Sequence, residues 1–187
     1  MDHDLNQRAA VKPPSLLPRS FYARPAQIVA KELLGKYLVR RIGVGGDDEH
    51  AVLITETEAY VGAHDLACHG RFGLTERTRV MFGPAGFWYV YLIYGMYWML
   101  NIVTGEEGAP EAVLFRGAGD YTGPGKLCRE LAIDKRFYGA PAEPTSGLWI
   151  EDRGHRVRRG AIQRTPRIGV DYAGEWKDKP LRFVLSR

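Results

Sequence analysis

The chain has 187 residues, of which 45% are hydrophobic and 26% are charged. This balance is typical of a globular domain and excludes a collagen-like, coiled-coil or wholly disordered chain. The two cysteines, Cys68 and Cys128, are too few for a disulfide framework, and neither has a second cysteine nearby, as a zinc site would need. The sequence therefore predicts reduced thiols, a cytoplasmic location, and neither a metal nor a cofactor.

The net charge of +4 is unevenly distributed along the chain. Residues 153–187 carry ten Lys and Arg side chains against three acidic ones, so this segment has a net charge of +7 and the rest of the chain −3. A basic segment on a near-neutral body favours a polyanionic partner. A solvated basic surface without a partner explains the same charge equally well.

The apolar run at residues 87–103 is the segment that a membrane helix would have to use. It has 17 residues, just short of a membrane span, and it contains several tyrosines, which prefer the membrane interface. The first residues include Asp2 and Asp4 and no apolar stretch, so they do not resemble a signal peptide. Neither a membrane partner nor export is expected.

The beginning of the chain predicts an arm followed by a helix. Residues 1–18 are polar and contain three prolines, which indicates a flexible N-terminal arm, and residues 19–187 are expected to form one domain. A helix then begins at Ser20 or Arg24 and ends at Gly35, because its apolar residues recur with helical spacing up to that glycine.

Beyond this helix, strands outnumber helices. Residues 64–81 have no clean period and many polar side chains, which is typical of a functional loop. A second helix is expected at residues 126–133. Strands are expected at residues 36–42, 51–61, 87–93, 96–103, 112–116, 148–151, 168–170 and 181–185. Since short turns join most of them, we predict an α+β fold in a single domain: a mostly antiparallel curved sheet with flanking helices and a protruding aromatic β-hairpin.

The strand at residues 51–61 carries two acidic residues with the spacing that places them on one face. Alternate residues of a strand share a face, so Ile54, Glu56, Glu58 and Tyr60, together with Val52, are expected to point the same way. Two carboxylates that follow two aliphatic side chains lie near a buried rim, where a carboxylate is costly unless it is paired or functional. An outward face with ordinary surface acids fits the pattern equally well.

The predicted hairpin at residues 87–103 is unusually aromatic. Rings occupy both of its faces, whereas core packing needs only one, and tyrosine hydroxyls need partners when buried. Tyr94 stands beside Gly95 at the expected tip, where a large ring suits a wedge between bases better than a core position. A hairpin whose tip packs on a neighbouring element is the alternative.

Two polar residues interrupt apolar strands, and one lysine begins a helix. Asn101 is either a structural clamp or a group that discriminates between ligands, because a buried amide needs hydrogen-bond partners. Arg116 ends an apolar strand, where it either pairs with a buried glutamate or simply lies at the surface. Residues 119–126 lack the glycine and hydroxyl positions of a phosphate-binding loop, but Lys126 at a helix start can still hold a single phosphate.

Taken together and in this order, these residues resemble the alkyladenine DNA glycosylase family, the mammalian type of 3-methyladenine DNA glycosylase, in a member of bacterial size. The resemblance extends from about residue 16 to residue 186. It is carried by Leu33-Leu34-Gly35-Lys36, Glu56-Thr57-Glu58-Ala59-Tyr60, Cys68-His69, residues 78–82 (TRVMF), residues 89–97 (YVYLIYGMY), Asn101, Leu114-Phe115-Arg116, residues 123–127 (GPGKL) and residues 167–176 (RIGVDYAGEW).

The resemblance implies a role for each matching residue. Glu58 would be the general base that activates a water, and Arg116 with a backbone carbonyl near Val170 would place that water. The flipped base would lie in a pocket, Tyr94 would fill the gap left in the stack, and Asn101 would exclude the 2-amino group of guanine. The walls of the base pocket would be Tyr60, His69 and Tyr91, and the contacts to the DNA backbone would be Lys126, Arg71, Arg77 and Arg167.

The implied activity is that of a monofunctional DNA glycosylase in base excision repair. Such an enzyme flips alkylated or deaminated purines out of duplex DNA and hydrolyses the N-glycosidic bond, leaving an abasic site. The implied partner is double-stranded DNA containing damaged purines, with no obligate protein partner, and the enzyme would work at the bacterial nucleoid. The chain departs from the family pattern at Gly70 and at Gly117-Ala118-Gly119-Asp120, where the loop path and the pocket wall can differ.

Two other classes of protein fit part of the sequence. A non-catalytic nucleic-acid-binding module explains the tyrosines and the basic flank, but not Glu58 on the same sheet. A glycoside hydrolase would use Glu56 and Glu58, which lie about 6.6 Å apart along a strand. That separation reaches the lower edge of the inverting range of about 6.5–9.5 Å, but neighbours on one face do not easily flank a sugar from opposite sides.

Overall fold

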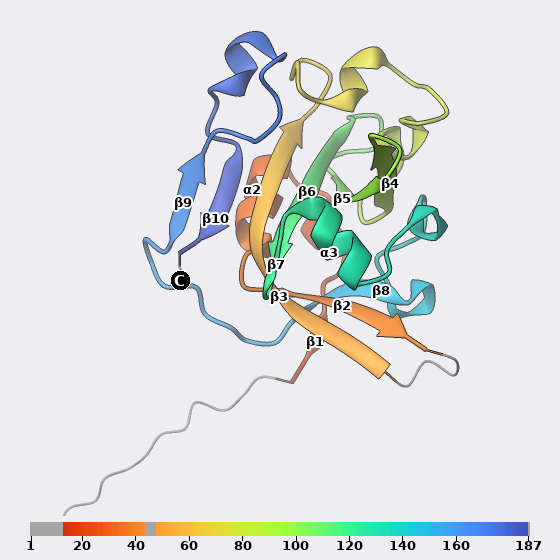
Figure 1. Ribbon diagram of the computed structural model, residues 1–187, viewed down its shortest axis with the longest axis vertical. Helices are drawn as coiled ribbons and strands as arrows, with labels where there is room; N and C mark the ends of the chain where they lie inside the picture. The colour runs from red at the N-terminus through yellow and green to blue at the C-terminus, as the bar shows by residue number, and fades with distance from the viewer. Residues whose placement is uncertain (1–12, 44–47, 187) are drawn as a thin grey trace, which may run out of the picture.

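The structure is a computed structural model that describes residues 13–43 and 48–186. The sheet has the strand order β1-β8-β2-β3-β6-β5-β4, with β10 added beside β3, β9 beside β10 and β7 beside β6, and all of these pairs are antiparallel. The α+β class and the mostly antiparallel sheet are therefore confirmed (Figure 1).

The described residues form short helices and ten strands. The helices are α1 (Arg19–Tyr22), α2 (Ala26–Leu33) and α3 (Pro124–Glu130), and the 3₁₀ turns are η1 (His69–Phe72), η2 (Arg79–Phe82), η3 (Lys135–Phe137), η4 (Pro144–Ser146) and η5 (Gly174–Lys177). The strands are β1 (Ser15–Leu16), β2 (Tyr37–Ile42), β3 (Asp48–Val61), β4 (Trp88–Ile93), β5 (Tyr97–Thr104), β6 (Glu111–Ala118), β7 (Tyr121–Thr122), β8 (Leu148–Asp152), β9 (Ile162–Thr165) and β10 (Arg182–Leu185).

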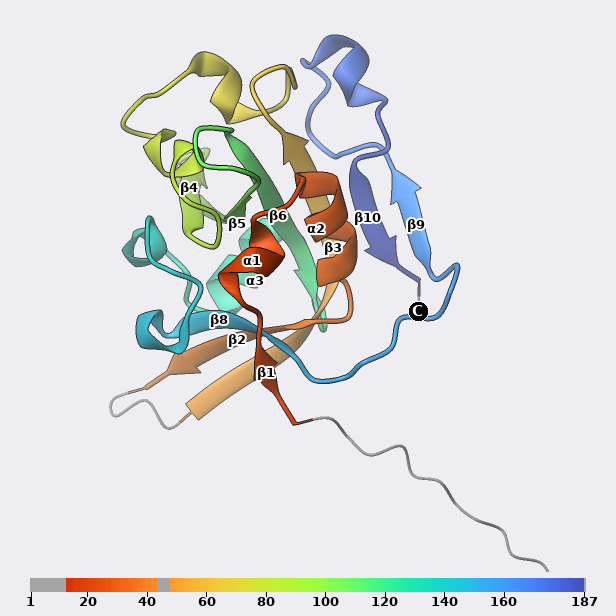
Figure 2. The ribbon, with the colours of Figure 1, turned by 180° about the vertical axis from the view of Figure 1, so that it is seen from behind.

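The helices flank the sheet from opposite sides. Helix α2 packs on β3 and β6, whereas α3 packs on β5 and β6, and Figures 1 and 2 show α3 in front of the sheet and α2 behind it. The buried side of α2 consists of Ala26, Val29, Ala30 and Leu33. Small residues at two of these positions let the helix lie close to the strands, and this contact forms the centre of the core.

Strand β3 pairs with β2 through its first half and with β6 and β10 through its second half. Its pairing is irregular where the two halves meet. Its pairing with β6 shifts register between Ile54 and Glu56 and again between Glu56 and Thr57. Ile54 is buried in the main core together with Ala59, so the expectation that Ile54 shares a face with Glu56 and Glu58 was wrong. The reason is the irregular pairing at this bulge, because two register shifts lie between Ile54 and Thr57 and interrupt the alternation of side chains that the expectation assumed.

Strands β4 and β5 form the expected hairpin, with Tyr94 and Gly95 at its tip (Figure 1). Both residues have positive φ, 53° and 69°, as the two central residues of a type I′ turn do. The Tyr94 side chain is 83% exposed, so the tip does not pack on a neighbouring element. Tyr94 therefore adopts a left-handed φ, which bulky side chains disfavour, while its ring is exposed to solvent.

Several expected boundaries moved. Residues 168–170 form no strand, since Gly169 with φ +77° turns the chain there. Helix α3 begins two residues earlier than expected, because Pro124 occupies its first turn. At the end of the expected arm, β1 pairs with β8. The first part of the arm, residues 1–12, lies outside the described residues, as do residues 44–47 between the expected strands at 36–42 and 51–61. The short strands β7 and β9 were not expected.

Among the helices that the structure describes, none is long and apolar enough to cross a membrane. The apolar run at residues 87–103 instead belongs to the β4–β5 hairpin.

The tip of the hairpin generates a prediction about stability. Tyr94→Asn should raise the free energy of unfolding by about 1 kcal/mol, because left-handed φ costs an ordinary side chain roughly 1–2 kcal/mol and asparagine less. A thermal melt would measure the gain as a rise of about 2–4 °C. Met96→Asn, at the next exposed position of the same turn, serves as the control and should give no gain. A lower melting temperature for Tyr94→Asn would contradict the prediction.

Candidate active site

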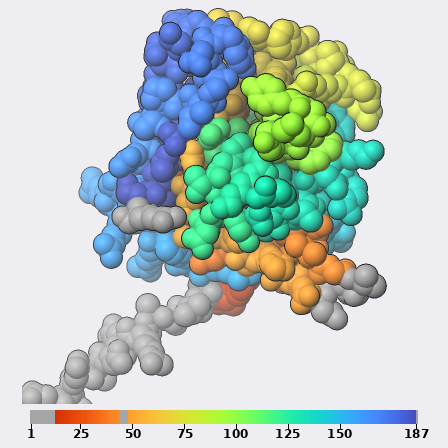
Figure 3. Space-filling view, in the orientation of Figure 1, coloured from red at the N-terminus to blue at the C-terminus, as the bar shows by residue number. Residues whose placement is uncertain are grey.

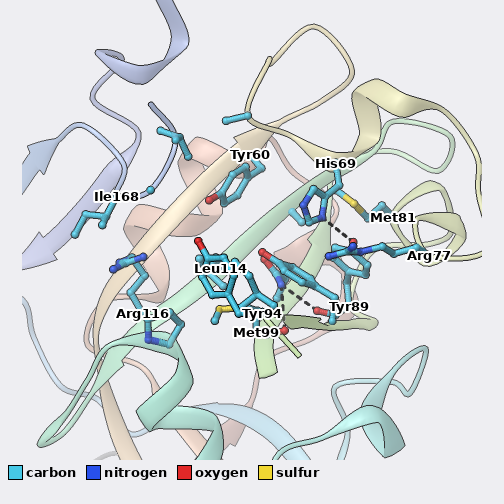
Figure 4. Close-up of a pocket in the computed structure, with 18 of the residues that line it drawn as sticks. Tyr60, His69, Arg77, Met81, Tyr89, Tyr94, Met99, Leu114, Arg116 and Ile168 are labelled. Atoms are coloured by element: carbon cyan, nitrogen blue, oxygen red, sulfur yellow. Dashed lines mark hydrogen bonds between the residues drawn. The ribbon is translucent and has the colours of Figure 1, made fainter. Parts of the chain in front are cut away.

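A cavity of about 490 Å³ opens beside the hairpin. Its lining comes from β3, from the 67–81 loop, from β4 and β5, from β6, and from residues 168–172. The face shown in Figure 3 is hollowed between the C-terminal segment, coloured blue, and the yellow-green hairpin. The expected pocket residues Tyr60, His69, Tyr91 and Asn101 all line this cavity, and so do Tyr94, Arg116 and Val170 (Figure 4).

Glu58 lies next to this cavity without exposing any surface. Its side chain is 0% exposed, and it follows the bulge in the second half of β3. One carboxylate oxygen accepts a hydrogen bond of 3.0 Å from the Tyr60 hydroxyl, and the other accepts one of 2.9 Å from the Ile168 N–H. Since Tyr60 and Ile168 both line the cavity, the carboxylate is one side chain away from it.

The environment of Glu58 shifts its pKa upward from that of a carboxyl in water. Burial raises the pKa of Glu58, and the charge of Arg116 and the Ile168 N–H only partly offset this effect. Arg116 approaches the carboxylate to 3.4 Å through Nε. A carboxylate with a raised pKa in a dry site is a better proton acceptor than one in water, which is the property that a general base needs.

Arg116 and Glu56 form a network beside Glu58. The Arg116 Nε donates to a Glu56 oxygen at 3.0 Å, and the Arg182 Nε donates to the same oxygen at 2.6 Å. Two guanidinium groups thus hold Glu56, which leaves it poorly placed to donate a proton to a substrate. The pair of carboxylates that a glycoside hydrolase needs is therefore divided into one paired residue, Glu56, and one buried beside the cavity, Glu58.

Gly117 lets β6 approach the bulge closely. A Cβ at Gly117 would lie 3.1 Å from the Cβ of Glu56 and 3.1 Å from the Thr55 hydroxyl. The departure from the family pattern at residues 117–120 takes the form of a short hairpin in which β7 returns beside the end of β6. The altered loop therefore supports the position of Glu56 and Arg116 through close backbone packing.

Aromatic rings form the walls of the cavity. His69 lies edge-on to Tyr91 at 4.7 Å between ring centres, and its Nδ1 is 2.9 Å from the Tyr89 hydroxyl. Burial lowers the pKa of His69 to about 4, and the nearby charge of Arg77 contributes, so the imidazole is neutral at physiological pH. Burial also raises the pKa of Tyr60 and of Tyr91, which keeps both hydroxyls protonated. The walls are therefore flat and uncharged, which suits a planar ligand.

Asn101 is the structural clamp that one of the two alternatives describes, and the discriminating role stays a prediction. Its Nδ2 donates hydrogen bonds to the backbone oxygens of Tyr89 and Met99, at 3.1 and 3.4 Å, so it clamps the hairpin. It also lines the cavity. A side chain that the backbone holds in this way presents a fixed shape to a ligand, which is a requirement for steric selection.

Close packing against Pro110 favours a glycine at position 70. A Cβ on Gly70 would lie 2.5 Å from the Cβ of Pro110, so no larger residue fits without a shift. The Cys68 thiol donates to the Pro110 oxygen at 3.3 Å. The turn that carries His69 therefore rests tightly on Pro110.

Arg167 was expected at the DNA backbone, but the structure buries it. Both Arg167 and Asp65 have fully buried side chains, and their bidentate ion pair has distances of 2.6 and 2.8 Å. The guanidinium also donates to the Ala59 oxygen and stacks on the Tyr60 ring, 4.7 Å from its centre. Arg167 thus fixes the wall of the cavity from behind. A buried bidentate pair has no surface left for a phosphate.

The other expected phosphate ligands lie closer to the surface, and one of them lines the cavity. Arg71 is exposed and stacks on Phe72 and, more distantly, on Tyr172, with its Cζ 4.4 and 5.9 Å from the ring centres. Lys126 donates to the Asp120 oxygen at 3.4 Å. Arg77 lines the cavity, with its Cζ 5.0 Å from the centre of the Tyr91 ring. The Val170 carbonyl, expected to place a water, accepts a hydrogen bond from the Ala173 N–H and has one lone pair left.

Sequence reasoning missed several lining residues. Tyr89, Met81, Met99 and Tyr172 all line the cavity. Tyr89 follows from the expectation for Tyr91, because residues two apart on a strand share a face. The two methionines carry no such signal. Within the described residues, no group of three or more His, Cys, Asp or Glu side chains gathers as a metal site would need.

A cavity with flat, neutral aromatic walls, two arginines in its lining and a buried carboxylate beside it is suited to hydrolysing a bond to a planar group. The methylpurine-DNA glycosylase family matches the chain over residues 20–120 and 119–187.

Three relatives carry the name "Putative 3-methyladenine DNA glycosylase". The one from Legionella pneumophila (strain Lens) is 48% identical, with 91% of this chain and 94% of the relative covered. The one from Myxococcus xanthus is 50% identical, with 89% and 88% covered, and the one from Methanocella arvoryzae is 46% identical, with 90% and 91% covered. The chain belongs to the methylpurine-DNA glycosylase family, and it is therefore a hydrolase of N-glycosyl bonds.

The burial of Arg167 generates a prediction. Arg167→Met should lower the free energy of unfolding by about 3–5 kcal/mol, because it leaves the Asp65 carboxylate buried without its cation. Urea unfolding would measure the loss. The control is Arg158→Met, at an exposed position, which should change stability by less than about 0.5 kcal/mol. Near-normal stability combined with weaker DNA binding in Arg167→Met would instead return Arg167 to the DNA interface.

Proposed function

We propose that the protein flips a damaged purine out of duplex DNA into the cavity and hydrolyses its N-glycosidic bond with a water that Glu58 activates. One observation carries this proposal: a carboxylate with 0% exposure lies one side chain away from an aromatic cavity and beside Arg116. Burying such a carboxylate lowers the stability of the fold, and buried carboxylates of this kind are typical of catalytic acids and bases.

The residues beside the cavity have distinct tasks in this reaction. The bond between C1′ of the deoxyribose and the purine nitrogen breaks, and its electron pair leaves with the base. The water oxygen bonds to C1′, and the proton of the water passes to Glu58. The developing positive charge on the sugar is stabilised by the same carboxylate. Arg116 and the Val170 carbonyl hold the water in line, since both residues line the cavity and Arg116 contacts Glu58.

Tyr94 is the group that replaces the flipped base in the stack. Its ring stands exposed at the tip of the hairpin, beside the mouth of the cavity that it also lines. Inserting an aromatic wedge offsets part of the cost of unstacking, and a damaged base that pairs poorly is cheaper to extrude. Once inside, the purine is enclosed by Tyr60, His69 and Tyr91, and Asn101 excludes the 2-amino group of guanine.

Contacts to phosphates come from exposed cations around the cavity. Arg71 extends from the 67–81 loop on one side, and Lys126 lies in α3 on the other. Phosphate contacts supply affinity and register without reading the sequence. The substrate in this proposal is therefore double-stranded DNA, and the cavity supplies the recognition of the damaged purine.

The first experiment measures release of a damaged base from duplex oligonucleotides that each carry 3-methyladenine, 7-methylguanine, hypoxanthine or ethenoadenine. Alkaline cleavage then reports abasic sites. Glu58→Gln keeps the shape of the side chain but removes the proton acceptor, so base release should fall by about 10²–10⁴-fold while lesion binding persists. Glu32→Gln, an exposed substitution of the same kind on α2, is the matched control. Binding without release by the wild-type protein would favour the non-catalytic module instead.

The raised pKa of Glu58 predicts a pH-dependent gain in stability. Folding raises this pKa, so the stability that the carboxyl contributes is complete below its unfolded pKa and is lost as the pH rises through its folded pKa. The free energy of unfolding of Glu58→Gln should therefore exceed that of the wild type at about pH 7.5, and the difference should shrink toward about pH 4. Urea titrations at both pH values would measure it, and a less stable variant at the higher pH would contradict it.

A further inference from the structure

Arg77 is exposed, as a residue that binds a DNA phosphate must be, but it also lies at the cavity, which phosphate binding does not require. Its side chain lines the cavity, and Figure 4 shows it beside His69 and Tyr89. The guanidinium carbon lies 5.0 Å from the centre of the Tyr91 ring, which forms the cavity wall. Attraction between the guanidinium and the face of this ring draws the cation toward the wall. The charge of Arg77 also reaches far enough to help lower the pKa of His69.

The two cations of the cavity differ in their partners. The lining includes Arg77 and Arg116 but no acidic side chain. Arg116 is neutralised by Glu56 and Glu58. Among the residues that the structure describes, no carboxylate lies within ion-pair distance of Arg77. The cavity therefore has one end where carboxylates balance the positive charge of Arg116 and one end where Arg77 contacts aromatic side chains without a balancing carboxylate.

We propose that Arg77 is a specificity-determining residue that favours neutral purines with hydrogen-bond acceptors over purines that already carry a positive charge. This inference rests on the proposed function of the same cavity. Its physical basis is the arrangement of the guanidinium, since the forked donors of arginine match the N7 and O6 acceptors of a purine edge. Hypoxanthine presents both acceptors.

A cationic lesion meets the opposite situation. In 7-methylguanine the methyl group occupies N7, so one acceptor is lost, and the base carries a positive charge in the nucleoside. Like charges repel more strongly as water leaves the cavity. Arg77 would therefore weaken the binding of this base while the neutral tyrosine and histidine rings continue to enclose it.

The same contact assists departure of a neutral base. When the C1′–N9 bond breaks, the electron pair goes to N9, and a neutral purine then becomes an anion whose charge spreads to N7 and O6. Hydrogen bonds from Arg77 stabilise this charge as it develops. Water supplies hydroxide to C1′ and its proton to Glu58, and the departing anion takes a proton from solvent. A cationic purine leaves as a neutral molecule and gains nothing from Arg77.

The test compares two lesions in one set of variants. Single-turnover rates of base release are measured for the wild type, Arg77→Met and Arg77→Lys on duplexes that carry either hypoxanthine or 7-methylguanine. Arg77→Met should lower the ratio of hypoxanthine to 7-methylguanine release by on the order of tenfold, since it removes a bidentate contact. Arg77→Lys keeps the charge but not the forked donors, so its ratio should fall between the other two.

Two further measurements distinguish this role from a phosphate contact or a folding defect. Arg79→Met removes a neighbouring exposed arginine that is outside the cavity lining, so it should change both rates in the same proportion. The salt dependence of DNA binding should keep its slope in Arg77→Met, whereas loss of one phosphate contact would reduce the slope by about 0.9. Thermal melts verify that each variant is folded.

The outcomes separate this inference from the proposed function. Release of both bases by the wild type, with an unchanged ratio in Arg77→Met, overturns the role of Arg77 alone. A ratio that rises in Arg77→Met overturns it as well. Release of neither base by the wild type overturns the proposed function and this inference together.

Discussion

The burial of one carboxylate is the constraint on which the rest of this structure depends. Glu58 is 0% exposed, and three groups from different parts of the chain hold it: the Tyr60 hydroxyl, the Ile168 N–H and Arg116. Each of these partners lines the cavity, so the arrangement that satisfies the carboxylate also builds one end of the site. Burial without these partners would cost several kcal/mol.

Bringing these partners to Glu58 requires irregular structure at defined points. The bulge in β3 turns the strand so that Ile54 enters the core while Glu58, beyond it, meets its partners next to the cavity. Gly117 lets β6 lie against that bulge. The buried pair of Arg167 and Asp65 then anchors the chain that presents the Ile168 N–H. Backbone features and one ion pair thus position a chemical group that they do not touch directly.

The site is asymmetric in charge, and this gives it its selectivity in our interpretation. At one end, Arg116 balances Glu58 and Glu56. At the other, Arg77 faces the cavity against the Tyr91 ring. The aromatic rings between them carry no net charge, so the two ends differ chiefly in the partners of their arginines. The exposed ring of Tyr94 is kept at a positive φ of 53°, at a cost in local stability.

The sequence by itself determined the sheet-rich α+β class and the aromatic hairpin, because these follow from local alternation and turn chemistry. Its ordered motifs, through the family resemblance, also indicated part of the cavity lining, including Tyr60, His69 and Tyr91. Only the tertiary structure decided which arginine lies at the surface, which at the cavity and which in the interior. Arg71, Arg77 and Arg167 look alike in sequence, yet the first two are exposed and only the second of them lines the cavity, while the third is buried on Asp65. The reason is that a cation's role depends on its distance to charges and water, and those distances are set by segments far apart in the chain.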